Sequence, residues 1–184
     1  APLSAESRIP NPESLSPQDN FWLAFVLCAL AALAPIWVVT YPPMQDLPQH
    51  AAQIFMWQHY NDPGFDFATR LEFQWFNPYL LGYAIWRALA CVLPVMAAGK
   101  LLVSAVVLAF PLAWLYWFKA AGQNERWWAL LGFPLAYSFN FYCGSLNFLL
   151  AMPLGLIALG CAWRHAQEGT IRAGLRLVLA GADS

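Results

Sequence analysis

The longest uncharged stretch of the chain sets the strongest limit on its fold. Residues 127–163 contain no Asp, Glu, Lys, Arg or His. As one helix they would extend about 55 Å at ~1.5 Å per residue, whereas the hydrocarbon core of a bilayer is ~30 Å thick. The stretch is therefore too long for one membrane span and about right for two. The polar, small-residue segment 138–147 (SFNFYCGSLN) is the expected turn, with Gly144 supplying conformational freedom.

The composition agrees with a protein that lies in lipid. Of the 184 residues, 60% are hydrophobic and 10% are charged. A soluble domain carries roughly 25% charged residues, so this chain lacks the polar surface that water requires. Nine basic and ten acidic residues create no field that would gather nucleic acid, and disorder needs low hydrophobicity. We therefore expect an all-α, polytopic protein of the lipid bilayer with no nucleic-acid partner.

Two further stretches are long and apolar enough to cross the membrane. Residues 21–39 are apolar throughout, and residues 101–118 are uncharged and end in an aromatic cluster. Both approach the ~20 residues that a span requires. A cleaved signal peptide is a poor alternative for the first stretch, because its apolar part would be shorter and a basic segment would directly precede it.

Residues 78–94 are ambiguous, because Arg87 lies in the middle of an otherwise apolar segment. A central arginine costs roughly 2.5–3.5 kcal/mol on insertion scales. If the segment lies in the interface, the chain has four spans and a cytoplasmic N-terminus. If the segment crosses, there are five spans and the N-terminus is external. Counting Lys and Arg does not choose between the two topologies, and the cost of Arg87 favours four spans.

The four-span interpretation divides the whole chain. In order, we expect a disordered polar arm (1–20), a first span (21–40), an external loop with juxtamembrane helices (41–98, of which 78–94 is interfacial or spanning), a second span (99–118), a cytoplasmic turn (119–126), two spans (127–143 and 145–163), and a basic cytoplasmic tail leading into a truncated segment (164–184).

The external loop offers a candidate catalytic pair. Asp46 directly precedes Leu47 and Pro48, as an N-cap acid precedes a first-turn proline, and the pattern up to about residue 60 suits a helix. Asp46 and His50 are four residues apart and would project on one side of its first turn. A carboxylate beside the membrane surface can act as general base toward an acceptor hydroxyl or amine. The structural alternative is that Asp46 is only an N-cap and His50 its partner.

The turn between the last two spans offers candidate substrate contacts. Asn140 and Asn147 flank it and, in the four-span interpretation, lie on the same side of the membrane as Asp46. Hydrogen bonding between helices is the commoner role of such residues. A divalent cation requires several converging oxygen ligands, and no second carboxylate can be placed beside Asp46. The sequence therefore assigns no metal ligand and leaves a divalent-metal cofactor open.

The order of these parts resembles the N-terminal module of the GT-C superfamily, the polyprenyl-phosphate-sugar-dependent membrane glycosyltransferases. A span is followed by a long external loop with an early Asp and a helix, then by NPYLLGYAIW (77–86), a second span and a basic turn. Residues 77–86 resemble the K-P-P-L-Y-Y-W-L-like segment that often closes this loop in the family. The resemblance covers about residues 20–165.

The resemblance implies a fold, an activity and a location. Asp46 would be the catalytic base, with a polyprenyl-phosphate-linked sugar as donor at the external face, and His50, Asn140 and Asn147 are the expected substrate contacts. We expect an integral protein of the bacterial inner (cytoplasmic) membrane with a cytoplasmic N-terminus. Many members carry a second acid, where this chain has Leu47 and an uncharged hairpin. Members usually run to several hundred residues, so the chain is expected to be a fragment that is inactive alone.

Two other functional classes stay open. A non-catalytic membrane subunit would pack against partner membrane helices through small-residue, proline-containing segments such as 29–35 and 155–160. A transporter would require polar or charged groups in the middle of a span, and only Arg87 fits that description.

Overall fold

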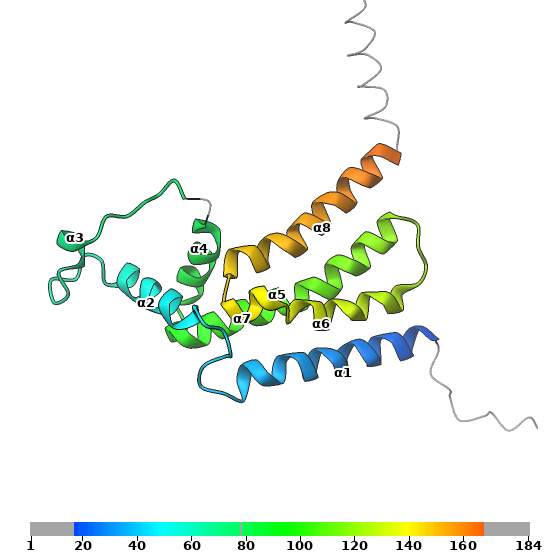
Figure 1. The fold of residues 1–184 in the computed structure, drawn as a ribbon, viewed down its shortest axis with the longest axis horizontal. Helices are drawn as coiled ribbons and strands as arrows, with labels where there is room; N and C mark the ends of the chain where they lie inside the picture. Colours follow the sequence, from blue (N-terminus) through cyan, green and yellow to red (C-terminus); the bar gives the residue numbers. More distant parts are fainter. Residues whose placement is uncertain (1–16, 78, 168–184) are drawn as a thin grey trace, which may run out of the picture.

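The computed structural model describes residues 17–77 and 79–167, and these residues form helices and no strand. The expected all-α class is therefore confirmed for this part of the chain (Figure 1). The expectations for residues 1–16 and 168–184 lie outside it. The helices are α1 (Pro17–Trp37), α2 (Leu47–Gln58), α3 (Phe67–Arg70), α4 (Leu80–Leu89), α5 (Val95–Ala120), the 3₁₀ helix η1 (Arg126–Leu131), α6 (Gly132–Ala136), α7 (Phe139–Cys143) and α8 (Leu146–Gln167).

Three helices in the described part of the chain are long and apolar enough to cross a membrane: α1, α5 and α8. They contain most of the expected spans 21–40, 99–118 and 145–163, and each extends beyond them. Helix α1 begins at Pro17, where a missing N–H is harmless because the first turn of a helix leaves its N–H groups unpaired. Helix α5 begins directly after Pro94. These three helices indicate an integral membrane protein.

The segment 127–143, expected as one span, is divided among η1, α6 and α7. Pro134 cannot donate a helical hydrogen bond. Gly132 packs so tightly on α5 that a Cβ there would lie 2.6 Å from the backbone of Pro111. The interrupted segment still runs back alongside α5, between it and α1 (Figure 1). A fourth or fifth crossing is not confirmed.

Helix α4 occupies the ambiguous segment 78–94 and has only ten residues. At ~1.5 Å per residue it is about 15 Å long, half of the hydrocarbon thickness. It is fastened to α5 by Trp86, which is fully buried and whose indole N–H donates to the carbonyl of Val95 at 2.8 Å. Gly99 makes this approach feasible, because a Cβ there would lie 2.1 Å from the Trp86 ring. The Arg87 guanidinium donates to Cys91 Sγ at 2.8 Å.

The helices place two distant parts of the sequence at one end of the molecule. Helices α2 and α4 and the α7–α8 turn lie at this end, and the start of α1 and the turn 121–125 lie at the other (Figure 1). The connection from α1 to α2 is fixed to α5, because the buried Lys100 ammonium donates to the carbonyl of Val39. The Trp37 indole N–H also donates to Ser104 Oγ at 3.0 Å. The main core lies here, around Ile54, Trp86 and Phe141.

Candidate functional site

One open cleft brings together all four site residues predicted from the sequence. It has a volume of about 470 Å³ and lies where α2, α4 and the α7–α8 turn meet. Its lining includes the predicted residues Asp46, His50, Asn140 and Asn147. The other residues that line it are Gln53, Asn77, Tyr79, Tyr83, Ser145, Leu146 and Phe148. The structure thus places these residues around one space, and their chemical roles stay predictions.

Asp46 lies at the N-cap position of α2, yet its side chain makes no capping hydrogen bond. The residue is instead held through its backbone, since Asp46 N–H donates to the carbonyl of Cys143 at 3.1 Å. The preceding Gln45 N–H donates to the carbonyl of Tyr142 at 2.8 Å. These two bonds fasten the loop to the end of α7, and Asp46 is one of the residues that line the cleft.

Gly144 allows this attachment for two reasons. It has a left-handed backbone with φ of +85°, which glycine adopts without steric cost. A Cβ at this position would also lie 2.8 Å from the backbone nitrogen of Asp46. The turn expected here is therefore present, and its glycine additionally supplies close contact with the candidate catalytic loop.

His50 is held at both ring nitrogens. Nε2 lies 3.0 Å from the carbonyl oxygen of Gly144, which can only accept a hydrogen bond, so Nε2 carries a proton. In the neutral ring Nδ1 then accepts from the hydroxyl of Tyr83, at 2.6 Å. Both polar atoms of the ring are engaged within the protein, so the geometry favours a positioning role over the direct substrate contact predicted for His50.

Tyr83 is a site residue that the sequence reasoning missed. Burial, and secondarily the negative charge of Asp46, raise the pKa of its phenol above the ordinary value. A signal was present in the sequence. Tyr79, Gly82, Tyr83 and Trp86 recur at the i, i+3, i+4 and i+7 spacing that defines one helix face. That face of α4 carries the buried Gly82 and Trp86 and the half-buried Tyr83.

The two predicted asparagines differ in what they do. Asn147 Oδ1 accepts a hydrogen bond from the N–H of Gly82 at 3.1 Å, in the first turn of α4, where helical N–H groups lack intrahelical partners. Asn147 thus joins α8 to α4, the interhelical role that was the alternative to ligand contact. The backbone carbonyl of Asn140 accepts from the N–H groups of Gly144 and Ser145 at 3.1 and 3.0 Å, and Asn140 is one of the residues that line the cleft.

No metal-binding cluster is assembled within residues 17–77 and 79–167, where no three His, Cys, Asp or Glu side chains converge suitably. Asp62, in the loop after α2, illustrates how another acid is used. It accepts from the Gly64 N–H at 3.0 Å and pairs with His59 at 3.2 Å. The Gly64 bond first, and then His59, lower the pKa of the Asp62 carboxyl.

No protein-family model, curated protein or solved structure matches this chain. Its function is therefore inferred from the geometry of the Asp46 cleft and from the order of parts along the chain.

Proposed function

We propose that this chain carries the catalytic base of a GT-C-like membrane glycosyltransferase, and that this base is Asp46. The observation that carries the proposal is the placement of Asp46. Its side chain does not cap α2, and Asp46 is one of the residues that line an open cleft of about 470 Å³ at one end of the bundle. A carboxylate used only for capping would be directed at the first N–H groups of its helix.

In the proposed topology the cleft is at the external face of a bacterial inner membrane. Helices α1, α5 and α8 cross, and the interrupted segment 126–143 returns beside α5, which gives four crossings and a cytoplasmic N-terminus. The positive charges Lys119, in the last turn of α5, and Arg126, the first residue of η1, support this sidedness. The turn between these two helices lies at the end of the bundle opposite the cleft (Figure 1). Basic residues are enriched in cytoplasmic loops.

The proposed reaction transfers a sugar from a polyprenyl-phosphate donor to an acceptor hydroxyl in the cleft. Asp46 accepts the hydroxyl proton while the acceptor oxygen forms a bond to the anomeric carbon. The bond from that carbon to the donor phosphate oxygen breaks, and polyprenyl phosphate leaves with the bonding electrons. His50 and Tyr83 hold the wall of the cleft beside Asp46 through their mutual hydrogen bond.

The test is Asp46→Asn, which keeps the size of the side chain and removes its basicity. Native membranes containing the protein would receive polyprenyl phosphate bearing radiolabelled mannose, glucose or arabinose, and transfer of label from the lipid phase to polar products would be measured. We expect a loss of at least about 100-fold, the lower range for general-base catalysis. Asp66→Asn is the matched control, because Asp66 is an exposed acid of the same loop that does not line the cleft.

The result must exclude loss of folding. Equal helical circular dichroism and equal thermal unfolding of both variants in nanodiscs would exclude it. Transfer at the wild-type rate in Asp46→Asn contradicts the proposal. Absence of transfer from all three donors by the full natural protein in its native membrane contradicts it as well, and would favour the non-catalytic subunit.

A further inference from the structure

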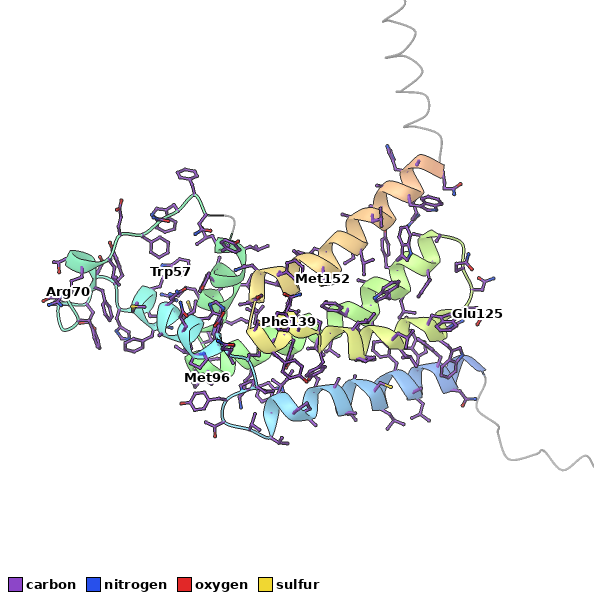
Figure 2. All side chains as sticks on the ribbon, in the orientation of Figure 1. Trp57, Arg70, Met96, Glu125, Phe139 and Met152 are labelled. Carbon is purple, nitrogen blue, oxygen red and sulfur yellow. The ribbon has the colours of Figure 1, made fainter. Side chains whose placement is uncertain are left out.

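A second cavity, of about 360 Å³, adjoins the Asp46 cleft along α2. Gln53, Asn77, Tyr79 and Tyr83 line both cavities, so the two spaces are neighbours. We call this second cavity, together with an adjoining cavity of about 480 Å³ that is lined by Trp75, the aromatic groove. It lies between the second half of α2 and the extended segment 71–77, and Figure 2 shows Trp57 on this side of α2.

Four aromatic rings give the groove its shape. The Phe73 ring centroid lies 4.7 Å from that of Trp57 and 4.4 Å from that of Trp75. Tyr60 is 6.3 Å from Phe73, and its hydroxyl donates to the carbonyl of Leu71 at 2.9 Å. This bond fastens segment 71–77 to the end of α2. Trp75 remains 61% exposed, so much of its ring surface is available to a ligand.

Polar side chains lie among these rings. Glu72 lines both cavities of the aromatic groove, and Trp75 lines the larger one. Gln53 and Gln74 add amide groups that can donate and accept. No Lys or Arg lines these spaces in the part of the chain that the structure describes, so they offer an anion no charged partner.

This combination suits a neutral sugar. A pyranose or furanose ring has C–H groups that pack on aromatic rings and hydroxyls that bond with carboxylate and amide groups. A polyprenyl chain has no hydrogen-bonding group, and burying Glu72 and Gln74 against it would leave them unsatisfied. A phosphate would face Glu72 without a cation.

We propose that the aromatic groove binds a neutral saccharide, the acceptor of the transfer, and directs one of its hydroxyls into the Asp46 cleft. The acceptor role rests on the proposed function, whereas the binding of the saccharide does not. The proposal assigns no donor site to the groove.

Binding is tested with the full natural protein in lipid nanodiscs, using mannotriose, maltotriose and arabinotriose as probes in saturation-transfer difference NMR. Trp75→Ala removes an exposed ring, and Glu72→Gln removes a charge at constant size. We expect each change to weaken binding of the preferred trisaccharide at least 5-fold. Phe76→Ala is the control, because Phe76 is fully exposed beside Trp75 and does not line the groove. It should stay within 2-fold of wild type.

The same samples test the alternative ligand of the groove, an isoprenyl chain. Farnesyl phosphate is added as a short isoprenyl probe. The proposal would be overturned if no trisaccharide binds while farnesyl phosphate binds to the wild-type protein and not to Trp75→Ala. Trisaccharide binding that is absent, or that neither variant changes, would overturn it too. Asp46→Asn should bind the trisaccharide normally. If Asp46→Asn also transfers normally, the proposed function fails while the saccharide site stands. If Asp46→Asn loses transfer while the groove variants bind as wild type does, the saccharide site fails and the proposed function stands.

Discussion

A Cβ atom on Gly144 would lie 2.8 Å from the backbone nitrogen of Asp46, so the turn before α8 and the loop before α2 interlock without space for a side chain. Two hydrogen bonds reinforce the contact. Asp46 N–H donates to Cys143 at 3.1 Å, and His50 Nε2 donates to the carbonyl of Gly144 at 3.0 Å. The position of the Asp46 carboxylate is thus set by residues almost a hundred positions later in the chain.

Gly144→Ala should therefore disturb both stability and the cleft. The left-handed conformation costs an L-residue about 1–2 kcal/mol, and the contact with Asp46 requires the loop to move as well. Gly122→Ala is the matched control, because Gly122 has φ of +75° and open space around it. We expect Gly122→Ala to cost about 1 kcal/mol and Gly144→Ala clearly more, measured as the free energy of unfolding in detergent.

The two glycine variants also separate the backbone strain of a left-handed residue from the loss of contact between Gly144 and the Asp46 loop. Only Gly144→Ala should weaken the His50 contact, visible as a shift of the His50 ring signals in ¹⁵N NMR. If the two variants lose equal stability and leave His50 unchanged, Gly144 serves only the turn and the interlock is not energetically important.

The pair of His50 and Tyr83 should show measurable coupling. Their 2.6 Å hydrogen bond is half-buried, and bonds of this kind contribute about 0.5–1.5 kcal/mol net. In a double-mutant cycle with His50→Ala and Tyr83→Phe, the loss of unfolding free energy in the double variant should be smaller than the sum of the single losses by about 1 kcal/mol. Tyr79→Phe with His50→Ala is the control pair, because Tyr79 is 61% exposed. Additive losses for His50 and Tyr83 would show that their bond contributes nothing.

The pKa of Tyr83 should report the charge of Asp46. Burial is the larger cause of its increase above 10.0 and Asp46 the smaller, so Asp46→Asn should lower the pKa without returning it to that value. The phenol carbon chemical shift of selectively labelled tyrosine, followed from pH 8 to 12, measures it. Asp66→Asn should leave the value unchanged.

The sign of the stability effect follows from the same increase. The folded state holds the Tyr83 proton more tightly than the unfolded state, so this stabilisation is complete below pH 10 and is lost as the pH rises through the folded pKa. A Tyr83 titration that is identical in wild type and Asp46→Asn would place the carboxylate farther from the phenol than the structure does.

The long helices could be predicted from sequence because their length is limited by the bilayer. Apolar runs near 20 residues correctly indicated α1 and α5, and the second half of the uncharged stretch 127–163 indicated α8. The interruption of 127–143 could not be predicted in this way, because it involves the contact of Gly132 with Pro111 on a different helix. The composition of a segment shows that it is apolar, but it does not show which other helix packs against it.

Part of the candidate site could also be predicted from the sequence, because the expected membrane crossings limit where the loops lie. The expected four spans would bring the Asp46 loop and the turn at Gly144 to one side of the membrane, and the structure places these two segments in contact. The engagement of His50 by Tyr83 depends on how α4 is rotated, which is fixed by Gly82 against Asn147 and Gly99 against Trp86. Such contacts join residues far apart in the chain, and a single sequence does not specify them.

The sidedness of the cleft is the prediction on which the proposed function most depends. In intact cells, with the native cysteines replaced, a cysteine introduced as Ala68→Cys in the exposed helix α3 should react with a membrane-impermeant thiol reagent. Gln123→Cys, in the exposed turn at the opposite end, should react only after lysis. The proposed glycosyltransferase would use its lipid-linked sugar donor at the external face, so the proposal requires the first pattern. The reverse pattern would place Asp46 in the cytoplasm, contradict the glycosyltransferase proposal and favour a non-catalytic membrane subunit.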